Sequence, residues 1–428
     1  MYIHERENWT QFRYDESSVS VLLEEAGRKI GLLYGKLSSL GFDSKLQAMA
    51  ESLTREVVYS SEIEGIRLNI DEVRSCIARR LGIANVKYSA PSHYVDAVVS
   101  VMLDAIEHYE RPLSKELLCG WQAAFFSTGY SEGSQIEVGQ YRTHEEHIVS
   151  GMFGREKIHY IAPAPERVEK EMSDFIDWFN SDNHTSYIVR SAIAHFCFVS
   201  IHPFEDGNGR IARILSEVML ARGDKDKFRF YNTSSVINRD KNHYYDILER
   251  MQHSDGDITE WIVWYIKTLL TALEDADTTL AAVLNKSMFW QNHTDITLSE
   301  RQHTILNLFL DGYEAKITSK NWASLAKCSK DTAIRDIQDL VDKNILCEDK
   351  PGAKRPSYNI VYNTDDISVF FSDVSITEEH GAFYLIATYK GKQKVRERIL
   401  TLDAERFQSE DLSQSGLLNK YCSYLVSR

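Results

Sequence analysis

Several features that would point to a membrane, secreted or nucleic-acid-binding protein are missing from this sequence. No run approaches the roughly 18 apolar residues of a membrane helix, and the N-terminus has no basic and apolar leader. The six cysteines are scattered without a CxxC pair, which fits reduced thiols in a cytoplasmic protein and argues against a metal–thiolate site. Acidic residues outnumber basic ones by 63 to 49, a net charge of −14, so a general binder of phosphate backbones is not expected.

Proline is also scarce, with seven in 428 residues, and apolar residues recur at helical spacing through most of the first 285 positions. At about 150 residues per domain, the length predicts roughly three domains. A polar stretch, 285–295, predicts a linker after the helical part. We predict helices over residues 19–40, 43–64, 92–109, 114–127, 165–180, 186–200 and 257–285.

Three further segments do not follow the helical pattern alone. Residues 139–165 are irregular and contain two β-prone runs around Gly151 and Gly154, which predict a short hairpin. Residues 297–362 have three helical patterns and then two strand-like runs, the order of a winged helix-turn-helix. Residues 366–428 offer three strand-like runs and a final short helix, a small α+β region. The fold class is therefore mainly α.

The most informative run is HPFEDGNGRIAR, which lies between two helical patterns at residues 202–213. Gly207 and Gly209 have no Cβ, so the backbone can approach a ligand closely. They also begin a helix, where unpaired N–H groups and the helix dipole favour an anion. Asn208 adds a side-chain donor between them. This part of the run predicts a phosphate-binding nest.

The other polar residues of the run complete a site for a polyphosphate. Arg210 and Arg213 are three residues apart on one helix face and can reach successive phosphates. Asp206 supplies a hard oxygen ligand of the kind that Mg²⁺ prefers. His202 precedes the nest and titrates near neutral pH, which suits a general base. The alternative is an ordinary helix–loop–helix turn with surface arginines, which would need eight specified positions to coincide.

This run matches the Fic family signature, HxFx[D/E]GNGRxxR, at every position. The resemblance covers about residues 45–285, and the first 90 or so residues look like the helical N-terminal domain of a bacterial subset of Fic proteins. It implies an all-helical Fic fold with a β-hairpin flap. It also implies transfer of AMP from ATP to a Ser, Thr or Tyr hydroxyl of a protein.

The resemblance assigns roles to the residues of the run. His202 would take the hydroxyl proton, and Asp206 would hold Mg²⁺ between the α- and β-phosphates of ATP. Arg210, Arg213 and the backbone nest would carry the charge of the leaving pyrophosphate, while Phe204 would anchor the loop in the core. Relatives that act as kinases carry lysine in place of the second motif glycine; Gly209 is intact here, which favours AMP transfer.

A second motif lies upstream, where SSEIEG at residues 60–65 fits the inhibitory pattern of the family, [S/T]xxxE[G/N]. Ser60 and Glu64 are four residues apart and share one helix face. A Glu64 carboxylate docked on Arg213 would occupy the guanidinium fork that the γ-phosphate needs, so that ATP binds only in an unproductive pose. The alternative is that Glu64 is an ordinary surface acid at a helix end. In related proteins the same glutamate can also help remove AMP from a modified target.

The resemblance also suggests contacts to the target and to adenine. The hairpin at 147–163 corresponds to the flap, which pairs with an extended target segment, and GQYR at 139–142 is either a buried turn below it or a contact. Of the two tyrosines that follow the motif, Tyr245 is favoured over Tyr244 as an adenine contact, and Gln252 stays doubtful. We expect His195 to be a core histidine. The expected flap contacts are Ile158, His159 and Tyr160.

Three hypotheses about function remain open from the sequence: an autoinhibited protein adenylyltransferase, a de-AMPylase of the same modification, and a nucleotide-sensing DNA-binding regulator. Ten basic and nine acidic residues in 297–362 leave DNA binding open beside a protein-contact or spacer role. The expected partners are ATP, Mg²⁺ and a protein substrate, possibly the chain itself or a second copy in a homo-oligomer. The predicted domains are residues 1–90, 91–285, 297–362 and 366–428.

Overall fold

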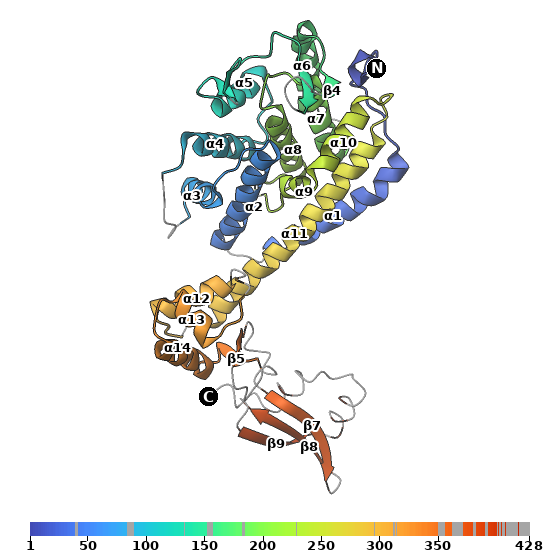
Figure 1. Cartoon of the computed structure of the whole chain (residues 1–428). Coiled ribbons are helices and arrows are strands. Elements are labelled where there is room, and N and C mark those ends of the chain that lie inside the picture. Colours follow the sequence, from blue (N-terminus) through green and yellow to red (C-terminus); the bar gives the residue numbers. More distant parts are fainter. Residues whose placement is uncertain are drawn as a thin grey trace. The chain divides into compact units, whose positions relative to one another are not determined.

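A computed structural model shows two compact units, residues 1–280 and 281–428 (Figure 1). The described residues are 1–38, 42–83, 90–131, 133–151, 157–181, 185–227, 229–294, 296–310, 313, 315–349, 356–361, 371–379, 382–389, 393–399, 401, 404, 407 and 418.

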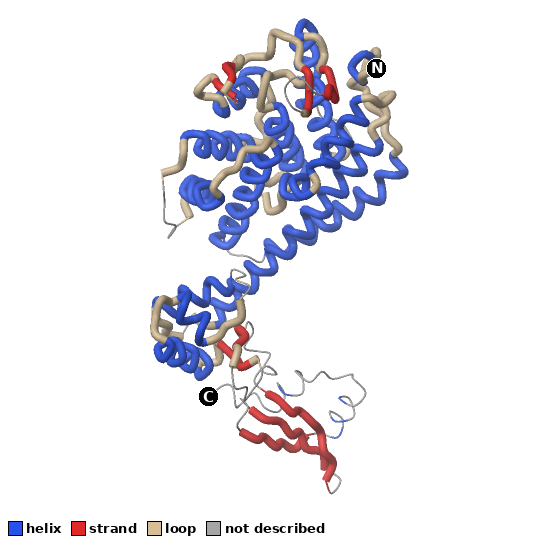
Figure 2. The backbone as a smooth tube through the Cα atoms, viewed as in Figure 1, coloured by secondary structure: helices blue, strands red, loops and turns tan. Residues whose placement is uncertain are grey.

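The first unit is built mainly of helices, as Figure 2 shows in blue, and this confirms the predicted fold class. Every helix expected from the apolar spacing is present, while α3, α9 and α10 were not among the predicted ones. The elements are η1 Ile3–Glu5, α1 Glu16–Ser38, α2 Phe42–Ile63, α3 Ile70–Arg80, α4 His93–Glu107, α5 Lys115–Phe125, α6 Pro165–Asn180, α7 Tyr187–Ile201, α8 Asn208–Asp224, α9 Ser234–Arg239, α10 Lys241–Gln252 and α11 Thr259–Asn292.

Helices α7 and α8 form the centre of this unit and are buried along most of their length. Gly223 lies inside α8, one residue before its end. A Cβ there would lie 2.7 Å from the Cβ of Tyr187, so glycine is needed where the two helices pack closely. The helix ends one residue later, and Lys225 takes the left-handed conformation with φ 52°.

The C-terminus of α2 is closed by a motif that determines where Glu64 lies. Gly65 has a φ of +79°, its N–H donates to the Glu62 carbonyl at 2.9 Å, and the Ile66 N–H donates to the Ser61 carbonyl at 3.0 Å. These two bonds make a Schellman cap, which requires a residue that accepts positive φ. Glu64 is therefore held directly after the last helical residue, Ile63, and the cap requires a residue such as glycine after it.

A β-hairpin lies between α5 and α6, as predicted. Strands β3 (His147–Ser150) and β4 (Lys157–Ile161) pair antiparallel, with Ile148 opposite Tyr160 and Val149 opposite Ile158. The register shifts between Ile148 and Val149, which marks a bulge. A smaller pair, β1 (Tyr130–Ser131) with β2 (Ser134–Gln135), precedes it.

The predicted linker at 285–295 is wrong, because α11 continues as a helix to Asn292. Phe289 is completely buried in the core of the second unit, and the Trp290 ring stacks on His303. Polar side chains are compatible with an exposed helix face, so polarity alone did not separate a linker from a helix.

The second unit continues with three helices and a two-stranded ribbon, in the order expected. These are α12 Glu300–Leu310, α13 Ser319–Leu325, α14 Lys330–Asp342, β5 Leu346–Glu348 and β6 Tyr358–Ile360. Three basic residues that stand between these two strands in the sequence, Lys350, Lys354 and Arg355, lie outside the described residues. A three-stranded antiparallel sheet follows, with β8 Ala382–Tyr389 between β7 Phe371–Glu379 and β9 Gln393–Ile399. The predicted final helix falls largely outside the described residues.

Candidate active site

The loop that joins α7 to α8 has a shape fixed by its own side chains. It begins at His202 with φ 53° and ends at Gly207 with φ 94°, both in the left-handed region. Phe204 is fully buried between them. Its N–H donates to the Asn208 side-chain oxygen at 3.0 Å, and the Asn208 side-chain nitrogen donates to the Phe204 carbonyl at 2.7 Å. Both atoms of the Asn208 side-chain amide thus hydrogen-bond inside the loop, where the sequence predicted a side-chain donor for a ligand.

The tautomer and the charge of His202 suit the base that the motif predicts. Its Nδ1 lies 3.1 Å from the Val199 carbonyl oxygen, so we assign the ring proton to Nδ1, which leaves the lone pair on Nε2. Burial lowers the pKa of His202 to about 4, against smaller opposing effects that include the nearby carboxylates. The ring is consequently neutral at pH 7 and can accept a proton without first losing one.

Arg142 binds the loop through hydrogen bonds to backbone carbonyl oxygens. Its guanidinium is buried and donates to the carbonyl oxygens of His202 at 2.8 Å, His144 at 2.8 Å and Pro163 at 2.6 Å. Gly139, with φ 72°, donates to the Gln122 side chain at 2.7 Å. Tyr141 and Arg142 are buried, while Gly139 is half-buried and Gln140 is exposed. The buried half of GQYR thus ties the motif loop to the base of the hairpin, which favours the first of the two alternatives.

We predict that Arg142→Met destabilises the first unit strongly. The substitution leaves several buried carbonyl groups without donors, each costing about 1–3 kcal/mol. A loss of about 3 kcal/mol corresponds to a fall in Tm of roughly 6–12 °C for a unit of this size. Thermal unfolding should show this fall, whereas Arg13→Met, which removes an exposed pair with Asp255, should change Tm by no more than a degree or two. Equal shifts in the two variants would contradict the role of Arg142.

The second motif arginine is bound to the end of α2. Arg213 is 1% exposed, and its Nη2 lies 2.6 Å from Glu64 Oε1. The same guanidinium donates from Nε to Ser60 Oγ at 2.9 Å and from Nη2 to the Ser60 carbonyl at 2.8 Å. Within the described residues its Nη1 is buried without a hydrogen-bond partner. The structure therefore brings Ser60, Glu64 and Arg213 together, the arrangement that the two motifs predicted.

The end of α2 covers further residues of the predicted nucleotide site. A Cβ on Gly209 would overlap Glu64 Oε1, so glycine at this position lets the carboxylate lie against the start of α8. The Tyr245 hydroxyl donates to the Ile63 carbonyl at 3.2 Å, and the Tyr245 side chain is otherwise partly exposed. The helix end thus occupies the surroundings of both the phosphate nest and the predicted adenine contact.

Arg210 and Asp206 form the outer side of the nest. Arg210 Nη2 lies 3.1 Å from Asp206 Oδ1, and Nη1 donates to the Tyr94 hydroxyl at 2.7 Å. The guanidinium carbon lies 4.9 Å from the ring centroid of Phe126, a cation–π contact. Ser131 donates from its hydroxyl to the other Asp206 oxygen. No sequence motif pointed to Tyr94, Phe126 or Ser131, because each comes from an element distant in the chain.

The donor set at Asp206 fits Mg²⁺ bound with a nucleotide rather than a metal cage made by protein alone. No group of three or more His, Cys, Asp or Glu that could hold a metal occurs within the described ranges. The Asp206 side chain is 37% exposed beside the start of α8. Mg²⁺ commonly takes one or two carboxylates and completes its shell with phosphate and water oxygens.

The predicted flap contacts separate into two groups. Ile158 is 47% exposed, as a target contact requires, and so is its partner Val149 at 46%. Tyr160 is completely buried, and its hydroxyl donates to the Ser200 carbonyl at 2.8 Å, so the prediction that it contacts the target is wrong. His159 Nδ1 lies 2.5 Å from Glu249 Oε2, which ties β4 to α10.

The remaining candidates have structural roles. Tyr244 is buried, and its hydroxyl lies 2.9 Å from His195 Nε2. Burial lowers the pKa of His195 to about 3, as expected for a core histidine. Gln252 is buried and donates to Ser200 Oγ at 3.4 Å.

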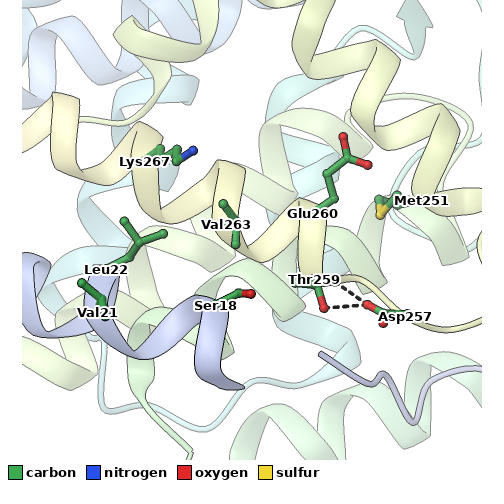
Figure 3. Close-up of a pocket in the computed structure, with 9 residues that line it drawn as sticks. All are labelled: Ser18, Val21, Leu22, Met251, Asp257, Thr259, Glu260, Val263 and Lys267. Carbon is green, nitrogen blue, oxygen red and sulfur yellow. Dashed lines mark hydrogen bonds between the residues drawn. The ribbon is translucent and has the colours of Figure 1, made fainter. Parts of the chain in front are cut away.

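A groove of about 720 Å³ lies between α1 and the start of α11, apart from the motif residues (Figure 3). Its polar groups serve the local fold: Thr259 donates from its N–H at 2.9 Å and from its hydroxyl at 2.6 Å to Asp257 Oδ1. It is lined by Ser18, Val21, Leu22, Met251, Asp257, Thr259, Glu260, Val263 and Lys267.

No helix among the described residues is long and apolar enough to cross a membrane.

Comparison with known proteins assigns families to two parts of the chain. Residues 112–220 match the Fic/DOC family, and residues 2–83 match a domain family of unknown function, DUF4172. The signature run at residues 202–213 lies inside the part of the chain that matches the Fic/DOC family.

Individual relatives are similar over limited stretches. The chain is 24% identical over 221 residues to "Protein adenylyltransferase Fic" of Nematostella vectensis, covering 50% of this chain and 47% of that protein. It is 37% identical over 89 residues to "Protein adenylyltransferase fic-1" of Caenorhabditis briggsae, covering 20% of this chain and 16% of that one. The aligned parts therefore span less than half of these relatives. A crystal structure of a Fic family protein from Desulfovibrio desulfuricans G20 has a TM-score of 0.48 at 19% identity, covering 80% of this chain and 96% of that one.

Proposed function

We propose that this chain is a protein adenylyltransferase that moves AMP from ATP to a hydroxyl of a protein. The observation that carries the proposal is the neutral His202, whose Nδ1 lies on the Val199 carbonyl and leaves the lone pair on Nε2, one short loop before the start of α8 and its two buried arginines. A base beside a polyphosphate site suits the attack of a hydroxyl on a phosphate.

The proposed reaction uses groups that the structure brings together. Nε2 of His202 accepts the proton of the target hydroxyl, whose oxygen forms a bond to the α-phosphorus of ATP. The bond from that phosphorus to the bridging oxygen breaks, and pyrophosphate leaves with the electron pair. Arg210, Arg213 and the N–H groups at the start of α8 would stabilise its charge. Asp206 would hold Mg²⁺, which neutralises phosphate charge when bound.

We further propose that the observed contact between Glu64 and Arg213 is inhibitory. The fork of Arg213 cannot pair with the γ-phosphate while it is bound to Glu64 and Ser60. A carboxylate in the same place also repels a phosphate. ATP would then bind in a pose that is not aligned for transfer.

The target would bind along the hairpin. Val149 and Ile158 are opposite one another on β3 and β4 and expose nearly half of their surfaces, which suits contact with an extended segment. The acceptor would be a Ser, Thr or Tyr hydroxyl of the target.

The proposal is tested with ATP labelled at the α- or γ-phosphate, incubated with Mg²⁺ and the Glu64→Gly chain, alone and with cell lysate. Protein-bound label from α-labelled ATP and none from γ-labelled ATP is the expected result. Label from γ-labelled ATP instead would make the chain a kinase. No label from either would contradict group transfer.

Two alternatives lead to different results. A de-AMPylase would release AMP from a modified protein and lose that activity in Glu64→Gly. A DNA-binding regulator would need a basic face, but the exposed charges of α14 are balanced, Lys330 and Arg335 against Asp331 and Asp342. The other two acids of this helix, Asp336 and Asp339, pair with Arg301 and Lys343.

A further inference from the structure

Glu56 is a buried glutamate of α2 that lies two turns before Glu64, on the same face of the helix. Glu56, Ser60 and Glu64 follow each other at intervals of four residues, so they lie along one side of the helix. Glu56 is 2% exposed. One of its carboxyl oxygens accepts from the Ser234 N–H at 3.2 Å, and the other accepts from the Ser234 hydroxyl. Both donors lie at the start of α9.

The surroundings of Glu56 disfavour its charged form. Burial, together with the charge of Glu217 on α8, raises the pKa of Glu56 to about 7, and the Ser234 donors and Arg213 only partly oppose this. Glu217 is itself paired with Arg229 at 3.0 Å. On the side of α3, Arg74 pairs with Glu51, one turn and a half earlier on α2.

We propose that Glu56 is a positioning residue for the inhibitory Glu64, and that its proton determines how firmly α2 docks on α9 and Arg213. This inference rests on the proposed function. Two acidic residues of the helix end are partly open to water: Glu62 accepts from Asn238 at 3.1 Å, and Glu64 is 28% exposed. The contact between Glu56 and Ser234 is a buried, ionisable link between α2 and α9.

The sign of the pH effect follows from proton linkage. A glutamate in water titrates near 4.5, and docking raises the pKa of Glu56 to about 7. The docked helix therefore binds the proton more tightly, and docking weakens as the pH rises through this window. Above the upper value both states are ionised, and no further change is expected. Release of inhibition with rising pH should follow.

The test is the ratio of AMP transfer by Glu64→Gly to that by the unsubstituted chain, measured between pH 5.5 and 8. The ratio cancels any pH effect on chemistry. It should fall by up to about tenfold per pH unit below pH 7 and level off above it. Glu56→Gln mimics the protonated carboxyl in shape and charge. The ratio of transfer by Glu64→Gly to transfer by Glu56→Gln should therefore stay high and constant over this pH range. Glu62→Gln is the control, since Glu62 lies on the same helix and is partly open to water. Its ratio should depend on pH as that of the unsubstituted chain does.

A second measurement does not depend on catalysis. Hydrogen exchange of amides 60–66, corrected for the chemical rate, should speed up with pH in the unsubstituted chain and not in Glu56→Gln. A pH-independent ratio and exchange, or the same slope in Glu56→Gln, would overturn the proposal and indicate that Glu64 moves without its helix. Absence of label in every variant would contradict the proposed function, while exchange would still decide the role of Glu56.

Discussion

Glu64→Gly should raise the rate of AMP transfer by about 10- to 100-fold. The substitution removes the carboxylate that lies 2.6 Å from Arg213 Nη2, and with it the negative charge that competes with the γ-phosphate for this guanidinium. A hydrogen bond to a charged group contributes about 1.5–3 kcal/mol, and each 1.4 kcal/mol corresponds to a factor of ten. Initial rates of label incorporation from α-labelled ATP measure the effect.

The matched control is Glu62→Gly, on the same helix end. Glu62 contacts Asn238 and makes no contact with Arg213 among the hydrogen bonds found in the described residues. It should therefore leave the rate within a few-fold of the unsubstituted chain. A rate for Glu64→Gly equal to that of the unsubstituted chain would show that the carboxylate does not inhibit, and an equal rise in both variants would assign the effect to a loosened helix end.

His202→Ala, made in the Glu64→Gly chain, should lower transfer by about 10²- to 10⁴-fold, the usual contribution of a general base. ATP binding should persist, because the nest, Arg210 and Arg213 remain. Equilibrium binding of ATP and label incorporation separate the two effects. Loss of both would give His202 a structural role at the end of α7.

The pH profile gives an independent check on the same residue. Burial lowers the pKa of His202 to about 4, so its base form persists from pH 8 down to about 5 and is lost only as the pH falls through 4. Transfer by Glu64→Gly should accordingly stay flat over that upper range. His144→Ala is the control, since His144 lies 2.8 Å from Glu205 beside the motif and has an exposed side chain. A loss of rate centred near pH 6.5 would indicate that His202 titrates as an ordinary surface histidine.

The sequence predicted those parts of the molecule that depend on local pattern. Apolar residues at helical spacing predicted the helices of the first unit, because each must bury one face. The glycines and arginines of residues 207–213 predicted the nest, because a helix start is itself an anion site. The contact between Glu64 and Arg213 was predicted from two motifs, and the Schellman cap at Gly65 explains why glycine follows the glutamate.

Contacts between distant elements were not predictable in this way. Tyr160 lies in an alternating strand, and only the fold shows that its hydroxyl reaches the Ser200 carbonyl. Asn208 was given to the ligand because the sequence cannot show that Phe204 uses its amide. Glu56 looks like any charged residue of an amphipathic helix, since glutamates are rarely buried. Its burial depends on where α9 packs.

The most direct test of the inhibited site is a comparison of ATP and ADP affinities, which isolates the γ-phosphate. Titration calorimetry would use His202→Ala, which prevents turnover, with and without Glu64→Gly. With Glu64 present, Arg213 is occupied, and ATP and ADP should bind about equally. With glycine, ATP should bind at least about tenfold more tightly than ADP, through one charge-assisted contact. The same ATP-to-ADP preference in both variants would contradict the claim that Glu64 takes the place of the γ-phosphate.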